Sequence, residues 1–185
     1  MTWSISDVRN IFFSGPYSFA ADEALVQKIH FLLNHDYLTC TRITIGAKDE
    51  FLEISSDSSH VSKHDEASGG GSAHIALKLL AQKYLLGLGF EAQFEQPFCG
   101  YYPDVISTDQ QTVVECGQTH NVDKMFAYFI DGKISDLIQV PYPTVDDSLV
   151  YGYRFIASKN LATFLKASFE DEKSKILQIL NRKDS

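Results

Sequence analysis

The sequence has few cysteines and no long apolar run. Its three cysteines, Cys40, Cys99 and Cys116, form no CxxC pair. This count and spacing argue against a disulfide framework or a structural zinc site, and they are typical of a reducing, cytoplasmic compartment. No apolar run reaches the roughly 18–20 residues that a membrane helix needs. The first residues also lack the basic and apolar segments of a signal peptide. We therefore expect a cytoplasmic protein that has no membrane partner.

The sequence also lacks an excess of positive charge. Sixteen Lys and Arg residues stand against 24 Asp and Glu residues, which gives a net charge of −8. This balance excludes a uniformly basic surface that would coat nucleic acid, although a local basic groove stays possible because steering depends on where the charges lie. The only net-basic part is 159–185. With 185 residues, 44% of them hydrophobic, the chain is long enough for one well-packed domain, with or without a small appendage.

Composition divides the chain into three parts. Residues 61–72 are rich in Ser and Gly and predict a flexible linker. We expect residues 1–60 to form an N-terminal appendage of one helix and a hairpin, and residues 73–185 to form the core with a C-terminal helix. In the appendage, apolar spacing predicts a helix at 19–35, strands at 38–46 and 50–54, and a hairpin loop at 46–49.

Within the core, periodicity and turn residues predict an alternating series of helices and strands. Ser72 is placed to cap the first helix. We expect helices at 72–86, 121–130 and 161–182, and strands at 91–96, 102–107, 112–116, 137–140 and 149–157. A tight turn at 108–111 makes the second and third of these strands a hairpin. The strands at 112–116 and 137–140 should be parallel, because a helix connects them. The fold class is therefore mixed α/β, with helices flanking a mixed sheet.

Two acidic residues lie in apolar strand surroundings. Asp104 follows Pro103 at the start of one hairpin strand, and Glu115 lies near the end of the other. In a hairpin the two can converge at one end of the sheet. Buried carboxylates are costly unless they are paired or bind a cation, and oxygen ligands of this kind suit Mg²⁺. The pattern therefore predicts a divalent-cation site.

These residues resemble a known signature. The segments Gly100–Ile106, which contains Pro103-Asp104, and Val113–Gln118, which contains Glu115, are similar to the motif of the PD-(D/E)XK nuclease superfamily. The resemblance covers about 72–140 and implies a restriction-endonuclease-like αβββαβ core. It implies that Asp104, Glu115 and the backbone carbonyl of Cys116 bind Mg²⁺, or Mn²⁺, and that the protein is an endonuclease hydrolysing phosphodiester bonds, with DNA as the expected substrate. A homodimer with two symmetric sites would cut both strands of a duplex.

The sequence departs from the family pattern at two places. The family's lysine should stand at 117, where this chain has Gly117. Lys124, in the first turn of the next helix, is the natural replacement, since Gly117 leaves room for its stem; Gln118 could serve instead if the strand bulges. The first helix carries no acidic residue at 73–90, but His74 and Lys78 share one face of it and could contact phosphate.

These departures leave two alternatives open. The chain could be a catalytically inactive member of the fold that acts as a nucleic-acid-binding or scaffold subunit. It could also be unrelated to nucleases, with Asp104 and Glu115 as ordinary surface acids and Lys124 as a solvated helix residue.

Overall fold

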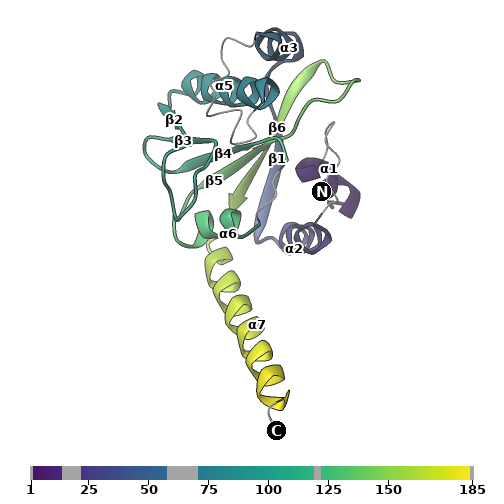
Figure 1. Cartoon of the computed structure of the whole chain (residues 1–185), viewed down its shortest axis with the longest axis vertical. Coiled ribbons are helices and arrows are strands. Elements are labelled where there is room, and N and C mark those ends of the chain that lie inside the picture. Colours follow the sequence, from purple (N-terminus) through teal and green to yellow (C-terminus); the bar gives the residue numbers. More distant parts are fainter. Residues whose placement is uncertain (1, 14–21, 58–70, 119–121, 184–185) are drawn as a thin grey trace.

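The computed structural model describes residues 2–13, 22–57, 71–118 and 122–183, and Figure 1 shows the arrangement of their helices and strands. Within this part of the chain the helices are α1 (Ile5–Phe13), α2 (Glu23–Asn34), α3 (Lys48–Ser56), α5 (Ser72–Gly87), α6 (Val122–Ile130) and α7 (Leu161–Lys183). The strands are β1 (Leu38–Ala47), β2 (Ala92–Phe94), β3 (Val105–Ser107), β4 (Thr112–Cys116), β5 (Asp136–Val140) and β6 (Leu149–Ala157). The predicted mixed α/β class is confirmed.

The strands form one mixed sheet. Its six described strands follow the order β1-β6-β5-β4-β3-β2. Neighbouring strands are antiparallel except β4 and β5, which are parallel and are connected through α6. The predicted hairpin of β3 and β4 and the predicted parallel pair are therefore confirmed. Strands β4 and β5 begin side by side, with Thr112 opposite Asp136. Asp136, at the start of β5, therefore lies at the other end of this parallel pair from Glu115, which is near the end of β4.

Helices cover both faces of this sheet (Figure 1). On one face, Val105, Val114 and Ile138 pack in a cluster with α3 and α5. On the other face, Ile106, Val113 and the rest of a larger cluster pack against α1, α2, α6 and the start of α7. Neighbouring strand residues point to opposite faces, so two consecutive apolar residues supply one side chain to each layer. This explains why β4 is buried along its whole length.

The N-terminal part differs from the prediction. The segment expected to form a hairpin loop and a second strand is helix α3, so the predicted hairpin is wrong. Two acids in its first turn favour a helix, because they interact well with the positive end of the helix dipole. Phe51 and Ile54, three residues apart, then face the cluster beneath α5. Helix α1 was not predicted.

Part of residues 1–60 belongs to the same sheet as the strands of 73–185. Strand β1 pairs along its length with β6, from Leu38 opposite Ala157 to Ala47 opposite Leu149. The N-terminal segment therefore supplies an edge strand of the same sheet that carries the two acids. The predicted linker at 61–72 lies outside the described residues except for 71 and 72. Gly71 occupies the N-cap position of α5, and Ser72 is the first helical residue.

The last helix confirms the prediction for 161–182 and extends away from the body of the molecule (Figure 1). Leu161 and Leu165, at its start, are buried in the larger cluster. In the described part of the chain, no helix combines the length and the apolar character needed to cross a bilayer.

Candidate functional site

A row of polar residues crosses the sheet at one end of β4. The register of β3 and β4 pairs Val105 with Val114, so one step further places Asp104 opposite Glu115. On the two flanks, Glu95 donates its backbone N–H to the carbonyl of Asp104, and Gln139 is the β5 partner of Glu115. Directly opposed residues have Cβ atoms about 4.5–5.5 Å apart. The two acids predicted from the sequence are therefore neighbours.

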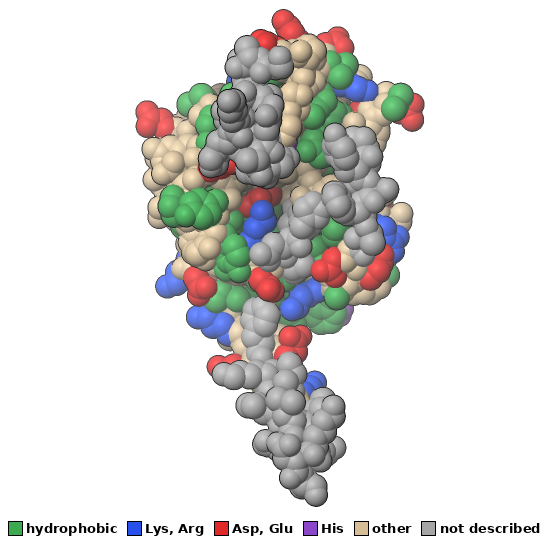
Figure 2. All heavy atoms as spheres, in the orientation of Figure 1, with side chains coloured by type: hydrophobic (Ala, Val, Ile, Leu, Met, Phe, Trp, Pro, Cys, Tyr) green, Lys and Arg blue, Asp and Glu red, His purple; other side chains and the backbone are tan. Residues whose placement is uncertain are grey.

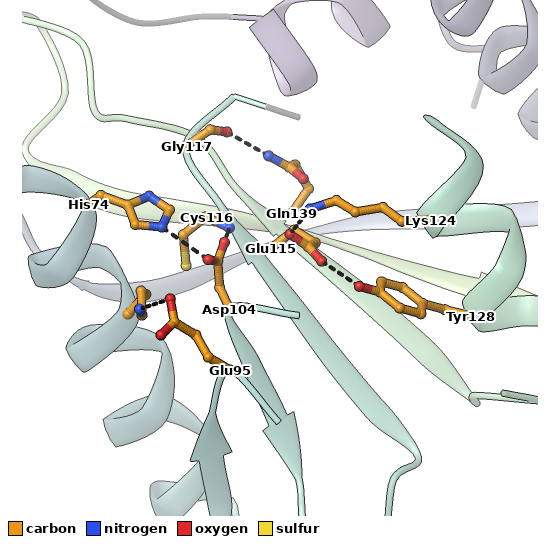
Figure 3. Close-up of polar contacts among 10 residues, drawn as sticks. His74, Glu95, Asp104, Glu115, Cys116, Gly117, Lys124, Tyr128 and Gln139 are labelled. Atoms are coloured by element: carbon orange, nitrogen blue, oxygen red, sulfur yellow. Dashed lines mark hydrogen bonds and ion pairs between the residues drawn. The ribbon is translucent and has the colours of Figure 1, made fainter. Parts of the chain in front are cut away.

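Asp104 is held from the α5 side (Figure 3). Its Oδ1 lies 3.0 Å from Nε2 of His74, and its Oδ2 accepts a hydrogen bond of 2.7 Å from the backbone N–H of Cys116. The side chain of Asp104 is 15% exposed. Because both oxygens have a partner, the carboxylate has a fixed orientation next to Glu115.

Glu115 is held from the α6 side (Figure 3). Lys124 donates a 2.5 Å hydrogen bond to its Oε2, and the hydroxyl of Tyr128 donates a 3.2 Å bond to its Oε1. Lys124 and Tyr128 lie four residues apart and so share one face of α6. The side chain of Glu115 is only 3% exposed, whereas that of Lys124 is 20% exposed. Lys124 therefore lies between Glu115 and solvent.

The two carboxyl groups have pKa values displaced in opposite directions. Burial and the charge of Asp104 raise the pKa of Glu115 to about 7, against the lowering effect of Lys124 and Tyr128. Burial would also raise the pKa of Asp104, but His74, the Cys116 N–H and the charge of Lys124 together hold it below its usual value. Asp104 is thus ionised at neutral pH, and Glu115 exchanges a proton there. Such divergent neighbours are typical of functional sites.

A third ion pair borders the acids. Lys78, one turn after His74 on α5, donates a 2.9 Å hydrogen bond to Glu95. The side chain of Lys78 is 8% exposed and that of Glu95 is 40% exposed. Glu95 also has a backbone φ of 48°, a conformation that costs free energy for a residue with a side chain. Each of the three basic side chains at the site is therefore paired with one carboxylate.

A lysine in place of Gly117 would be strained in this structure. Its φ is 76°, and a Cβ atom there would lie 2.9 Å from the Tyr142 ring. Strand β4 ends at Cys116. The amide of Gln139 donates a 2.6 Å hydrogen bond to the Gly117 carbonyl and fixes this turn. The expectation that Gly117 leaves room for the stem of Lys124 is corrected, because Tyr142 fills that space. Gln118 lies beyond this turn and outside the strand.

The structure brings together most of the residues predicted from the sequence. Asp104, Glu115, Lys124 and His74 form one contact network, and Cys116 joins it through its backbone N–H. Lys78 adjoins the network but is buried against Glu95 rather than open to phosphate. The alternative in which both acids are ordinary surface residues is wrong, because Glu115 is buried.

Sequence reasoning missed the partners that lie elsewhere in the chain. These are Glu95, Tyr128 and Gln139, which support Lys78, Glu115 and Gly117 respectively. Tyr128 follows Lys124 by four residues, so the helical period could have revealed it. Gln139 is an uncharged polar residue in the predicted strand 137–140, whose other residues are apolar, and this was a second available signal. Nothing in the sequence marks Glu95 as the partner of Lys78.

The two carboxylates offer oxygen ligands, the type that suits Mg²⁺ and Mn²⁺. Mg²⁺ takes one or two protein carboxylates and keeps several waters, which matches Asp104 and Glu115. Among the described residues, no group of three or more His, Cys, Asp or Glu side chains that could hold a metal ion is found. For a cation to reach both acids, Lys124 must release Glu115. The carbonyl of Cys116 stays a prediction as the third ligand.

Comparisons with known proteins add no assignment to this site. The chain matches no protein-family model, no curated protein and no solved structure. Its functional interpretation therefore depends on the geometry of the paired carboxylates and on the residues that hold them.

Proposed function

We propose that this protein is a divalent-metal-dependent endonuclease that hydrolyses phosphodiester bonds in DNA. One observation carries the proposal: two carboxylates lie opposite each other on neighbouring strands, and a lysine and a histidine from two different helices hold them. Burying two like charges together opposes folding. Such an arrangement is typical of a site kept for a ligand.

A restriction-endonuclease-like core is part of this proposal. Support comes from the order α5, β2, β3, β4, α6, β5 and from the parallel pair β4 and β5. Asp104 directly precedes β3, and Glu115 lies near the end of β4. The free thiols of Cys40, Cys99 and Cys116 are consistent with a cytoplasmic protein.

The residues of the site have separate roles in this mechanism. Asp104 and Glu115 would hold Mg²⁺, or Mn²⁺, which lowers the pKa of a bound water and stabilises negative charge on a phosphate. His74 and the Cys116 N–H orient Asp104. Once released from Glu115, Lys124 offers an ammonium group that can neutralise phosphate charge or position the attacking water, as the family's lysine does. The displaced ammonium is already at the site, so little chain motion is required.

Cleavage and metal binding test this proposal together. The assay measures hydrolysis of labelled single-stranded and duplex DNA with Mg²⁺, with Mn²⁺ and with EDTA. We expect metal-dependent cleavage that falls at least about 100-fold in Asp104→Asn and in Glu115→Gln. Calorimetry should show that both variants bind Mg²⁺ more weakly than the wild type. Robust cleavage by both variants would contradict the proposal.

Asp136→Asn is the matched control. Asp136 is a buried carboxylate of the same sheet that pairs with Arg154 at 2.7 Å and accepts a bond from Thr112. It lies at the other end of the parallel strands. This variant also loses a buried charge, but it should keep the metal affinity and the cleavage of the wild type. Circular dichroism of each variant separates a lost site from a lost fold.

A second candidate function is a nucleic-acid-binding or scaffold subunit without hydrolytic activity. One argument for it is the absence of a lysine at 117, where the backbone conformation and the Tyr142 ring disfavour a side chain. A second is that both acids are paired with basic side chains. DNA binding without Mg²⁺ binding, and without cleavage under any metal, would favour this candidate over the nuclease.

A further inference from the structure

Tyr102 is the most exposed aromatic side chain among the described residues, with 65% of its surface accessible. The other exposed rings differ from it in position or contacts. Phe31, at 41%, stacks on His35 and Phe164, and Phe90, at 42%, lies near the start of β5. Aromatic rings normally cover their apolar faces. An exposed ring that is close in the chain to a candidate site offers a face on which a ligand can stack.

The backbone on both sides of Tyr102 is held firmly. Phe98 and Tyr101 exchange backbone hydrogen bonds of 2.8 and 2.9 Å, which close a tight turn. The ring of Tyr101 packs edge-on against Tyr128, with centroids 6.2 Å apart, and Pro103 is buried. With its neighbours anchored inward, Tyr102 presents its ring on a preorganised segment, so that ordering it on binding costs little.

Tyr102 is close to the paired carboxylates. It precedes Asp104 by two residues, so their Cα atoms are at most about 7 Å apart. A nucleotide joins its base to its phosphate through a single sugar. A phosphate bound at Asp104 and Glu115 would therefore bring a neighbouring base within reach of the Tyr102 ring.

The charges of the protein favour such a contact. The net charge is −8, and the three basic side chains at the site are each paired with a carboxylate. Binding through phosphate contacts alone needs several free basic groups, because its affinity comes from counterion release. Base stacking adds affinity through contacts that carry no charge themselves.

We infer that Tyr102 stacks on an unpaired base next to the bound phosphate, and that the substrate of this site is single-stranded DNA. The inference rests on the proposed function and names its substrate class. In a duplex, both faces of each base are covered by its neighbours, so that the ring finds no free face there. An unpaired strand offers a face at every nucleotide.

Fluorescence anisotropy with a labelled single strand and a hairpin duplex of the same sequence tests this inference. Ca²⁺ replaces Mg²⁺, because it also takes oxygen ligands. We expect Tyr102→Ala to weaken single-strand binding about 5- to 150-fold and to leave duplex binding unchanged. Tyr102→Trp should restore the affinity. On a strand with abasic central positions, wild type and Tyr102→Ala should bind equally.

Phe90→Ala is the matched control, because it removes an exposed ring at the other end of the parallel strands and should not change the affinity. Equal single-strand binding by wild type and Tyr102→Ala would overturn the inference but leave the cleavage proposal intact. An equal loss on single strand and duplex would overturn it as well. If the wild type bound neither DNA, the inference would fail, and a parallel absence of metal-dependent cleavage would also remove the proposed function.

Discussion

The buried carboxyl of Glu115 should make the stability of the protein depend on pH in an unusual direction. Its pKa of about 7 lies above its ordinary value of 4.5, so the folded chain holds this proton more tightly than the unfolded chain. Stability from this group is complete below about pH 4.5 and is lost as the pH rises through 7. Between about pH 5 and about pH 8, the loss amounts to about 2 kcal/mol.

Glu115→Gln removes this effect while keeping the shape of the side chain. We expect the variant to be more stable than the wild type at about pH 8, and the gain in the free energy of unfolding to shrink by about 2 kcal/mol at about pH 5. Urea denaturation at both pH values measures the difference. Glu53→Gln, an exposed acid on α3, controls for the change in net charge. A gain that is equal at the two pH values, or larger at the lower one, would refute the reasoning.

The same variant links stability to metal binding. A ligand that binds only the folded chain stabilises it by an amount that grows with the logarithm of the ligand concentration above the Kd. At about pH 8, Mg²⁺ should therefore stabilise the wild type and have little effect on Glu115→Gln. Glu115 would then lower the free energy of unfolding in the absence of a cation and raise it when a cation binds. This is the usual trade between stability and activity.

Two further substitutions probe the residues around this acid. Lys124→Met removes the nearest positive charge and should raise the pKa of Glu115 further. We expect cleavage to fall at least about 100-fold and the pH–rate profile to move to higher pH; a fall in rate without this displacement would contradict the positioning role of Lys124. Gly117→Ala should destabilise the fold by about 2 kcal/mol in urea denaturation, because φ is 76° and the new Cβ meets Tyr142. Gly87→Ala, at a helical glycine with open space around it, is the control and should be neutral or stabilising.

Much of the fold follows from local pattern. Strands β4 and β6 have the predicted boundaries, and α7 ends within one residue of its predicted end, because apolar runs bounded by turn residues determine such elements. The segment around Phe51 fails as a prediction since a short apolar run fits either a strand or a helix. Packing of this segment in the same cluster as α5 stabilises it as a helix rather than a strand. The pairing of β1 with β6 could not be predicted, because register between distant strands leaves no local signal.

In the candidate site, too, local features could be predicted from the sequence and contacts between distant residues could not. The opposition of Asp104 and Glu115 follows from a hairpin with a short turn, so the sequence alone predicts it. The contact between His74 and Asp104 joins residues 30 positions apart and depends on how α5 lies over the sheet. The conformation of Gly117 depends on Tyr142, which belongs to a loop after β5. Sequence reasoning could detect the missing lysine but not the ring that occupies its place.

The position of β1 has a consequence for the order in which the molecule can assemble. This strand is synthesised well before its partner in the sheet, β6, from which a long stretch of chain separates it. Closing so long a loop costs entropy and slows folding. By contrast, the hairpin that carries both acids needs only a four-residue turn. The paired carboxylates can therefore meet in a partly folded chain, well before β1 pairs with β6 at the edge of the sheet.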